Sequence, residues 1–243
     1  MPNRHFYNIA MVKETLFSLS IEKIDEEHAV LRGIKGSNMS DEGIFKELGK
    51  YESRSCHYQT PDEVKIYTCL DSDDKEYKII RIQDCAFSNC KDLVNLIIGP
   101  YVKEIGWNMY RCDSLMNIRV DTKNAIYHDI DGVLYLNDEL VAFPQGRTGH
   151  YNVPNGTKKI GRMAFKSCNL SSIYFPNTLE EIGINSFYEC RNIREFVLPK
   201  SIKRVNRNCN VGHEPITQDF YFFDDKEKKN PLKISDIILM FPA

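Results

Sequence analysis

A short pattern of apolar and polar positions recurs along the chain. Each copy begins with an apolar residue, followed five positions later by an aromatic residue and then by a cysteine. The apolar positions are Ile82, Ile105, Ile160, Ile182 and Val205, the aromatic ones Phe87, Tyr110, Phe165 and Phe187, and the cysteines Cys90, Cys112, Cys168 and Cys190. The steps between the apolar positions are 23, 55, 22 and 23 residues, and 55 is one repeat plus an insert of 32. The pattern therefore indicates a repeat of about 23 residues.

Each copy continues with apolar residues at the first, fourth and sixth positions of a short segment, the signature of a leucine-rich repeat. These segments cover residues 93–98, 115–120, 170–175 and 193–198. A strand alternates its side chains between two faces, so only one face is buried. One repeat cannot bury that face alone, and consecutive repeats must stack. We predict an α/β fold: a leucine-rich-repeat solenoid with one short parallel strand per repeat and short helical turns.

The segment before the clear repeats predicts a mixture of elements. Residues 16–21 and 29–34 read as two strands joined by a turn at 25–28, residues 40–49 as a short helix and residues 63–70 as a further strand. The first repeat would otherwise expose apolar surface and a sheet edge, so we interpret residues 1–77 as an N-terminal cap. An independent small binding domain is the alternative. The repeats then occupy residues 78–223, and residues 224–243 form a closing segment.

The insert, residues 121–157, predicts a small β-meander. Residues 125–130, 133–136 and 140–143 read as strands, separated by hairpin turns at Asp131-Gly132 and Asn137-Asp138. We expect this meander to project from the stack. A last strand, with Phe220 and Phe222 inward, is expected beyond Val205.

The repeat resembles a known family. Ile-Gly-x-x-Ala-Phe-x-x-Cys-x-x-Leu, read at 160–170 with one residue missing and at 182–193 with Ser186 in place of Ala, resembles the BspA-type leucine-rich repeat of bacterial surface proteins and some protists. The insert resembles the hairpin that these proteins often place between repeats. The likeness covers about residues 79–202 and departs from the pattern at Met109 and Asn210. It implies a non-enzymatic adhesion module that is at the cell surface or secreted.

The outward strand positions are the candidate binding surface. They vary between repeats while the inward positions stay apolar, and stacking sets them in rows about 4.8 Å apart. They are Asn95, Ile97, Asn117, Arg119, Ser172, Tyr174, Glu195, Val197 and Tyr221. A tyrosine and an arginine among mixed polar residues are typical of protein interfaces. The alternative is a face that only meets solvent.

Composition and charge argue against several classes of protein, namely disordered, nucleic-acid-binding and membrane-spanning ones. With 42% hydrophobic residues the 243-residue chain can build a sizeable core, and its net charge of −2 favours neither nucleic acid nor an anionic membrane as a partner. The longest apolar run, residues 237–241, is far too short to span a membrane. The apolar stretch before Lys13 is too short for a secretory segment, which makes a cytoplasmic location the alternative.

No chemistry-bearing motif stands out. The four repeat cysteines form one row that is expected to be buried as small apolar side chains, whereas pairing of Cys56, Cys69, Cys85 and Cys209 stays open. The histidines have no metal-ligand spacing, and His128, Asp129 and Asp131 suit a turn as well as a metal. Nucleotide-binding and serine-hydrolase motifs are absent. We expect no enzyme activity, no cofactor and no metal.

The first hypothesis is therefore a recognition or adhesion module, a monomer, that holds a protein or glycan through the repeat sheet. The second is an intracellular scaffold or regulatory protein-interaction module, for which unpaired thiols would be ordinary. A third hypothesis is an enzyme with its site in the N-terminal cap, but no group of candidate catalytic residues in the sequence supports it.

Overall fold

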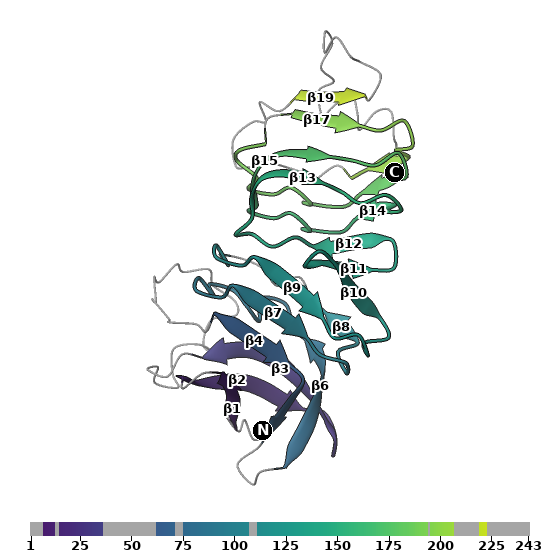
Figure 1. Ribbon diagram of the computed structural model, residues 1–243. Coiled ribbons are helices and arrows are strands. Elements are labelled where there is room, and N and C mark those ends of the chain that lie inside the picture. Colours follow the sequence, from purple (N-terminus) through teal and green to yellow (C-terminus); the bar gives the residue numbers. More distant parts are fainter. Residues whose placement is uncertain are drawn as a thin grey trace.

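The protein is a stack of short strands (Figure 1). The computed structural model describes residues 7–12, 15–35, 62–70, 75–106, 111–193, 195–206 and 219–222. Within these ranges the chain forms four sheets, two built from strands within residues 7–120 and two from strands within residues 127–222.

The N-terminal sheet has the order β1-β2-β3-β6-β5, with β8 also paired to β6. Its strands are β1 (Tyr7–Val12), β2 (Thr15–Lys23), β3 (His28–Lys35), β5 (Thr68–Leu70), β6 (Glu76–Ile82) and β8 (Glu104–Ile105). The two strands predicted at 16–21 and 29–34 are confirmed as the antiparallel pair β2–β3. The helix predicted at 40–49 lies outside the described residues.

The strand predicted at 63–70 is two strands that belong to different sheets. β4 (Glu63–Ile66) pairs with a repeat strand, whereas β5 pairs with β6. The chain changes sheet at Tyr67, whose hydroxyl donates a hydrogen bond to Asp121 at 2.6 Å. This bond to a carboxylate raises the pKa of Tyr67 to about 12. Tyr67 thereby ties the point of change to the loop that follows β9.

The strands of the leucine-rich segments form two parallel sheets. One has the order β4-β7-β9, with β7 (Asn95–Ile98) and β9 (Asn117–Val120). The other has the order β13-β15-β17-β19, with β13 (Thr148–Asn152), β15 (Asn169–Tyr174), β17 (Glu195–Leu198) and β19 (Asp219–Phe222). Inward residues such as Leu96, Ile98 and Ile118 are fully buried, as the alternating pattern predicts.

The remaining sheet lies on another side of the stack and has the order β10-β11-β12-β14-β16-β18. Its strands are β10 (Tyr127–Ile130), β11 (Val133–Leu136), β12 (Glu139–Ala142), β14 (Lys159–Ile160), β16 (Glu181–Ile182) and β18 (Arg204–Val205). The last three contain the apolar residue that begins each repeat, and they pair in parallel register.

The prediction of short helical turns is wrong for the described residues, which contain strands and turns but no helix. In segments 84–89, 162–167 and 184–189, two residues four positions apart have a left-handed backbone. They are Cys85 and Asn89 (φ 61° and 64°), Met163 and Ser167 (56° and 57°), and Asn185 and Glu189 (53° and 62°). A left-handed residue cannot continue a right-handed helix, so each segment is a series of turns. The observed architecture is a strand-rich repeat fold.

Aromatic side chains line up inside the stack. Phe87, Phe165 and Phe187 are buried, with exposed fractions of 0%, 0% and 2%, as predicted. Phe165 stacks on Phe187 with a centroid distance of 5.2 Å and on Phe143 at 5.0 Å. Phe143, assigned to the insert from the sequence, therefore takes the aromatic position of a further repeat.

The cysteine row is buried, as predicted, and bonds each repeat to an earlier one. The Sγ atoms of Cys112 and Cys190 lie 2.9 and 2.8 Å from the carbonyl oxygens of Phe87 and Phe165, both 25 residues earlier in the chain. Burial raises the pKa of the Cys190 thiol to about 12, and burial together with nearby Asp92 does the same for Cys90. These thiols act as small apolar side chains with one weak donor.

The meander is confirmed, because β10–β11 and β11–β12 pair antiparallel across turns at Asp131-Gly132 and Asn137-Asp138. It does not project from the stack, however. β12 continues in parallel to β14, and Val133, Leu134 and Tyr135 are buried. Val133 and Tyr135 belong to the C-terminal core cluster and Leu134 to the N-terminal one. Because both faces of β11 are buried, the meander is part of the core.

Candidate binding surface

The predicted surface residues form rows, but on two sheets instead of one. Strand register sets Glu63, Asn95 and Asn117 in one row of the three-stranded sheet and Lys65, Ile97 and Arg119 in the next. On the four-stranded sheet, register sets Asn152, Tyr174, Val197 and Tyr221 in a row and pairs Glu195 with Asp219 and His150 with Ser172. The expected continuous patch is therefore divided.

The meander is the cause of the division. The backbone N–H of Ile118 in β9 donates to the carbonyl oxygen of Gly132 at 2.8 Å, so the Asp131-Gly132 turn occupies the place of the next parallel strand. Gly146 donates to the Leu115 carbonyl oxygen at 2.8 Å, which holds the start of the next repeat against the end of β9. The two parallel sheets meet at this junction without pairing to each other.

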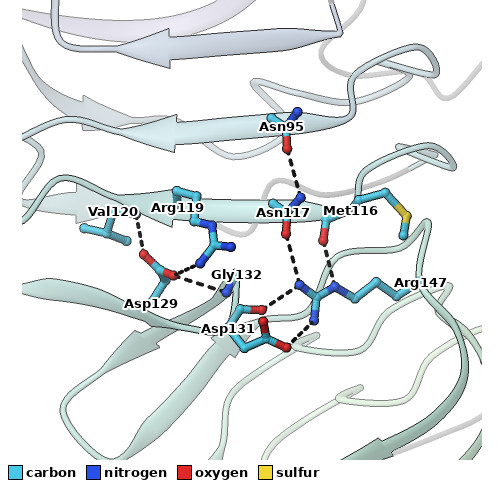
Figure 2. Close-up of polar contacts among 9 residues, drawn as sticks. All are labelled: Asn95, Met116, Asn117, Arg119, Val120, Asp129, Asp131, Gly132 and Arg147. Carbon is cyan, nitrogen blue, oxygen red and sulfur yellow. Dashed lines mark hydrogen bonds and ion pairs between the residues drawn. The ribbon is translucent and has the colours of Figure 1, made fainter.

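Figure 2 shows a chain of hydrogen bonds across the junction. The Arg147 guanidinium donates to the carbonyl oxygens of Met116 at 2.7 Å and Asp131 at 2.6 Å, and to Asn117 Oδ1 at 3.2 Å. The Asn117 amide then donates to Asn95 Oδ1 at 2.9 Å. Because Arg147 can only donate, it fixes the orientation of both amides. Asn95 and Asn117, predicted as ligand contacts, are thus tied to the fold.

Asp129 organises the other side of the junction. Its carboxylate accepts hydrogen bonds from the backbone of Val120 at 2.8 Å and Gly132 at 3.1 Å, and from Arg119 Nη1 at 3.0 Å. The Asp129 side chain is 14% exposed, and that of Arg119 is 51% exposed. The residue expected to be either a metal ligand or a turn residue therefore holds a turn, and the predicted anchor Arg119 already has an ionic partner.

The four-stranded sheet is different, because its outward side chains leave an aromatic ring accessible. Tyr174 is 54% exposed, the largest value among the exposed large hydrophobic residues of the described chain. Its register neighbours are Asn152, which is exposed, and Val197, which is half-buried. Beside it His150 Nδ1 lies 2.5 Å from Ser172 Oγ and 3.5 Å from Ser171 Oγ.

Several surface residues were missed from the sequence, namely Glu63, Lys65, Arg147, His150 and Asn152. Residues 148–152 were assigned to the insert, but they form β13. A signal was present, since Val153-Pro154-Asn155 repeats the strand ending Phe175-Pro176-Asn177 and Leu198-Pro199-Lys200. Arg147 had no such signal, because its partners lie 16 to 31 positions away in the chain.

The described residues contain no group of three or more His, Cys, Asp or Glu side chains that could hold a metal ion. His150 and Ser172 are close, but none of the hydrogen bonds found in the described ranges joins a carboxylate to that imidazole, as an activated serine would require. No helix in the described part of the chain is long and apolar enough to cross a membrane.

In-register parallel strands, buried aromatic residues and a repeat of 22 or 23 residues define a leucine-rich repeat protein. The family described as the BspA-type leucine-rich repeat region matches residues 67–130 and 141–218, in six copies. These residues make up more than half of the chain, which therefore belongs to that family. No curated protein matches the chain.

Solved structures of bacterial leucine-rich repeat proteins are similar to this chain. A protein from Eubacterium ventriosum is 19% identical over 61% of this chain and 46% of its own, with a TM-score of 0.49. One from Bacteroides ovatus is 17% identical over 88% and 53%, with a TM-score of 0.45. The pneumococcal vaccine antigen PcpA is 13% identical over 90% and 82%, with a TM-score of 0.40. The chain thus spans about half the length of the first two proteins.

Proposed function

We propose that this chain is a non-enzymatic recognition module that holds a protein or glycan through the outward side of the β13-β15-β17-β19 sheet. Leucine-rich repeats generally present an extended surface of this kind to a partner. The family membership agrees with binding as the role of this chain.

The accessible ring of Tyr174 is the observation that carries the proposal. Outward residues of the three-stranded sheet are engaged in internal bonds through Arg147 and Asp129, whereas Tyr174 is 54% exposed on an inner strand of the four-stranded sheet. An aromatic ring on a rigid strand gives much contact area at little cost in conformational entropy. The four-stranded sheet is therefore a better candidate for the binding surface than Asn95, Ile97, Asn117 and Arg119.

The test is a binding screen of the purified chain against arrayed secreted proteins and arrayed oligosaccharides, repeated with two variants. Tyr174→Ala removes the ring from the four-stranded sheet, and Lys65→Ala removes an exposed side chain from the three-stranded one. The proposal expects Tyr174→Ala to abolish binding and Lys65→Ala to leave it intact, with both melting temperatures near that of the wild type. Binding lost only in Lys65→Ala would assign the surface to the other sheet.

Adhesion at the cell surface is the biological setting we propose, by analogy with the family. The intracellular scaffold is the second candidate, and the exposed thiol of Cys85 favours it, because accessible unpaired thiols are uncommon in oxidising compartments. Surface proteolysis of intact cells that produce the chain separates the two. Digestion by an added protease supports the surface setting, and full protection supports the scaffold.

A further inference from the structure

We infer that the binding surface on β13 and β15 is built for an uncharged carbohydrate, with Tyr174 as the stacking platform. This inference rests on the proposed function and narrows its ligand to one chemical class. The seven outward side chains of the two strands carry hydroxyl, amide, imidazole or phenol groups. They are Thr148, His150, Asn152, Asn169, Ser171, Ser172 and Tyr174.

None of these seven side chains is a carboxylate, an ammonium or a guanidinium, although 27% of the residues in the chain are charged. The three-stranded sheet differs, since Glu63, Lys65 and Arg119 stand at its outward positions. On the four-stranded sheet, carboxylate residues return only at β17 and β19, where Glu195 pairs with Asp219. A ligand with a carboxylate or sulfate would find no opposite charge on β13 and β15.

The arrangement matches the two kinds of surface on a sugar ring. The C–H face of a sugar is weakly positive and fits the negative face of an aromatic ring, which Tyr174 exposes. The sugar rim consists of hydroxyl groups, which need donors and acceptors at its edge. Asn152 lies beside Tyr174 in register and offers both kinds of group. Val197 on the other side extends the apolar platform.

A β-bulge places more hydroxyl groups next to this platform. Gly149 pairs with Leu170 and His150 with Ser172, so Ser171 is the extra residue. Bulges of this kind re-aim side chains. Ser171 donates to the Gly149 carbonyl oxygen at 2.8 Å, and Ser172 lies 2.5 Å from His150 Nδ1. The imidazole is thus held by Nδ1, on a residue that is itself exposed.

A protein partner fits the same side chains less well. Protein interfaces concentrate several aromatic and arginine anchors in a desolvated centre. The seven outward positions of β13 and β15 offer one aromatic residue and no arginine. One ring among small hydroxyl and amide groups matches a single sugar unit, and the row of Asn152, Tyr174 and Val197 continues across the neighbouring strands.

The experiment is an array of neutral oligosaccharides with sialylated and sulfated analogues, followed by NMR titration of the best binder at millimolar concentration. We expect neutral sugars to bind, acidic analogues to bind no better, and Tyr174→Ala to weaken binding at least about tenfold. Tyr174→Phe keeps the ring and should stay within about threefold of wild type. Tyr101→Ala, which removes an exposed tyrosine after β7, is the matched control and should change nothing.

The outcomes separate this inference from the proposed function. If no neutral sugar binds but a protein does, and Tyr174→Ala abolishes that binding, the carbohydrate inference is overturned while the proposed function stands. If a sugar or protein binds equally well to wild type, Tyr174→Ala and Asn152→Ala, both are overturned. Preference for acidic sugars would also overturn the inference, because β13 and β15 offer no cation.

Discussion

Gly132 joins the meander to the repeats at a point where no side chain fits. Its φ is +70°, a conformation that residues with a Cβ adopt at a cost. A Cβ built there would lie 2.7 Å from Asn117 Oδ1 and 2.8 Å from Arg147 Nη2. Its carbonyl oxygen meanwhile accepts the bond from Ile118. One glycine therefore permits both the turn and its contact with β9.

Gly132→Ala is expected to destabilise the chain by about 2–4 kcal/mol, since backbone strain adds to the collision with two bonded side chains. Gly156→Ala is the matched control: Gly156 has φ +93° but nothing within 4 Å of its Cβ position. The control should cost only about 1 kcal/mol of strain. Urea unfolding measures both. Equal losses for the two variants would show that the collision with Asn117 and Arg147 does not matter.

The thiols should divide into reactive and unreactive sets. Only the thiolate reacts with alkylating reagents, and burial raises the pKa of Cys90 and Cys190 to about 12 and that of Cys168 well above its usual value. Cys85 is exposed. At pH 8, iodoacetamide should modify Cys85 within minutes and leave the three buried thiols intact until the chain is unfolded. Peptide mass spectrometry reads the result, and early modification of Cys168 would contradict the buried row.

At the level of elements, alternating charges favour the observed strand order of the β10-β11-β12-β14-β16-β18 sheet. Register sets Glu139, Lys159, Glu181 and Arg204 side by side across β12, β14, β16 and β18. Lys159 Nζ lies 3.0 Å from Glu139 and Arg204 Nη2 lies 2.5 Å from Glu181. If a strand paired with the repeat after its proper neighbour, like charges would meet, for example Glu139 and Glu181. The meander, which begins this row at Glu139, is thereby aligned with the repeats.

Arg147 is expected to contribute more to the free energy of unfolding than an ion pair in the row of Glu139, Lys159, Glu181 and Arg204. Arg147→Met leaves the Met116 carbonyl oxygen and Asn117 Oδ1 without their donor, in a side-chain environment that is only 17% exposed. The expected loss is about 2–3 kcal/mol in the free energy of unfolding. Arg204→Met removes an ion pair whose arginine is 56% exposed and should cost at most about 1 kcal/mol. Urea titrations compare the two, and the reverse ranking would contradict the account.

The meander also shows what sequence patterns can and cannot predict. The turns at Asp131-Gly132 and Asn137-Asp138 were predictable, because turn chemistry is local. The pairing of Glu139 with Lys159 and the bonds of Arg147 to Asn117 are not local. The sequence patterns alone therefore predict a meander that projects from the stack. For the same reason, the sequence predicts the order of the outward residues along the stack. It does not predict that they are divided between two sheets.

On the scale of the whole molecule, two core clusters meet at the meander. Val133 and Tyr135 of β11 pack into the C-terminal cluster and Leu134 into the N-terminal one. In repeat proteins each unit contacts mainly its neighbours, so the two halves can differ in stability. The inward alternation of apolar residues predicted a stacked core, but not its division into two clusters. That the insert would supply their common wall was not predictable, since its strands look like an ordinary hairpin.

Leu134→Ala is expected to weaken the N-terminal half more than the C-terminal half. Truncating a fully buried leucine costs about 2–5 kcal/mol, and Leu134 packs only into the N-terminal cluster. Native-state hydrogen exchange should show faster exchange in β7 and β9 and little change in β15 and β16. Ile173→Ala, in the C-terminal cluster, should give the opposite pattern. A uniform loss of protection in both variants would mean that the stack unfolds as one unit.

The central claim is that the stacked repeats keep their core inside and present the outward side of β13 and β15 to a partner. Its most direct test is to replace Tyr174 with the photoreactive residue p-benzoylphenylalanine, and Tyr101 likewise in a control, and to irradiate each with the ligand found in the array screen. The account predicts a covalent adduct at position 174 and none at position 101. An adduct at position 101 alone, or equal adducts at both positions, would contradict it.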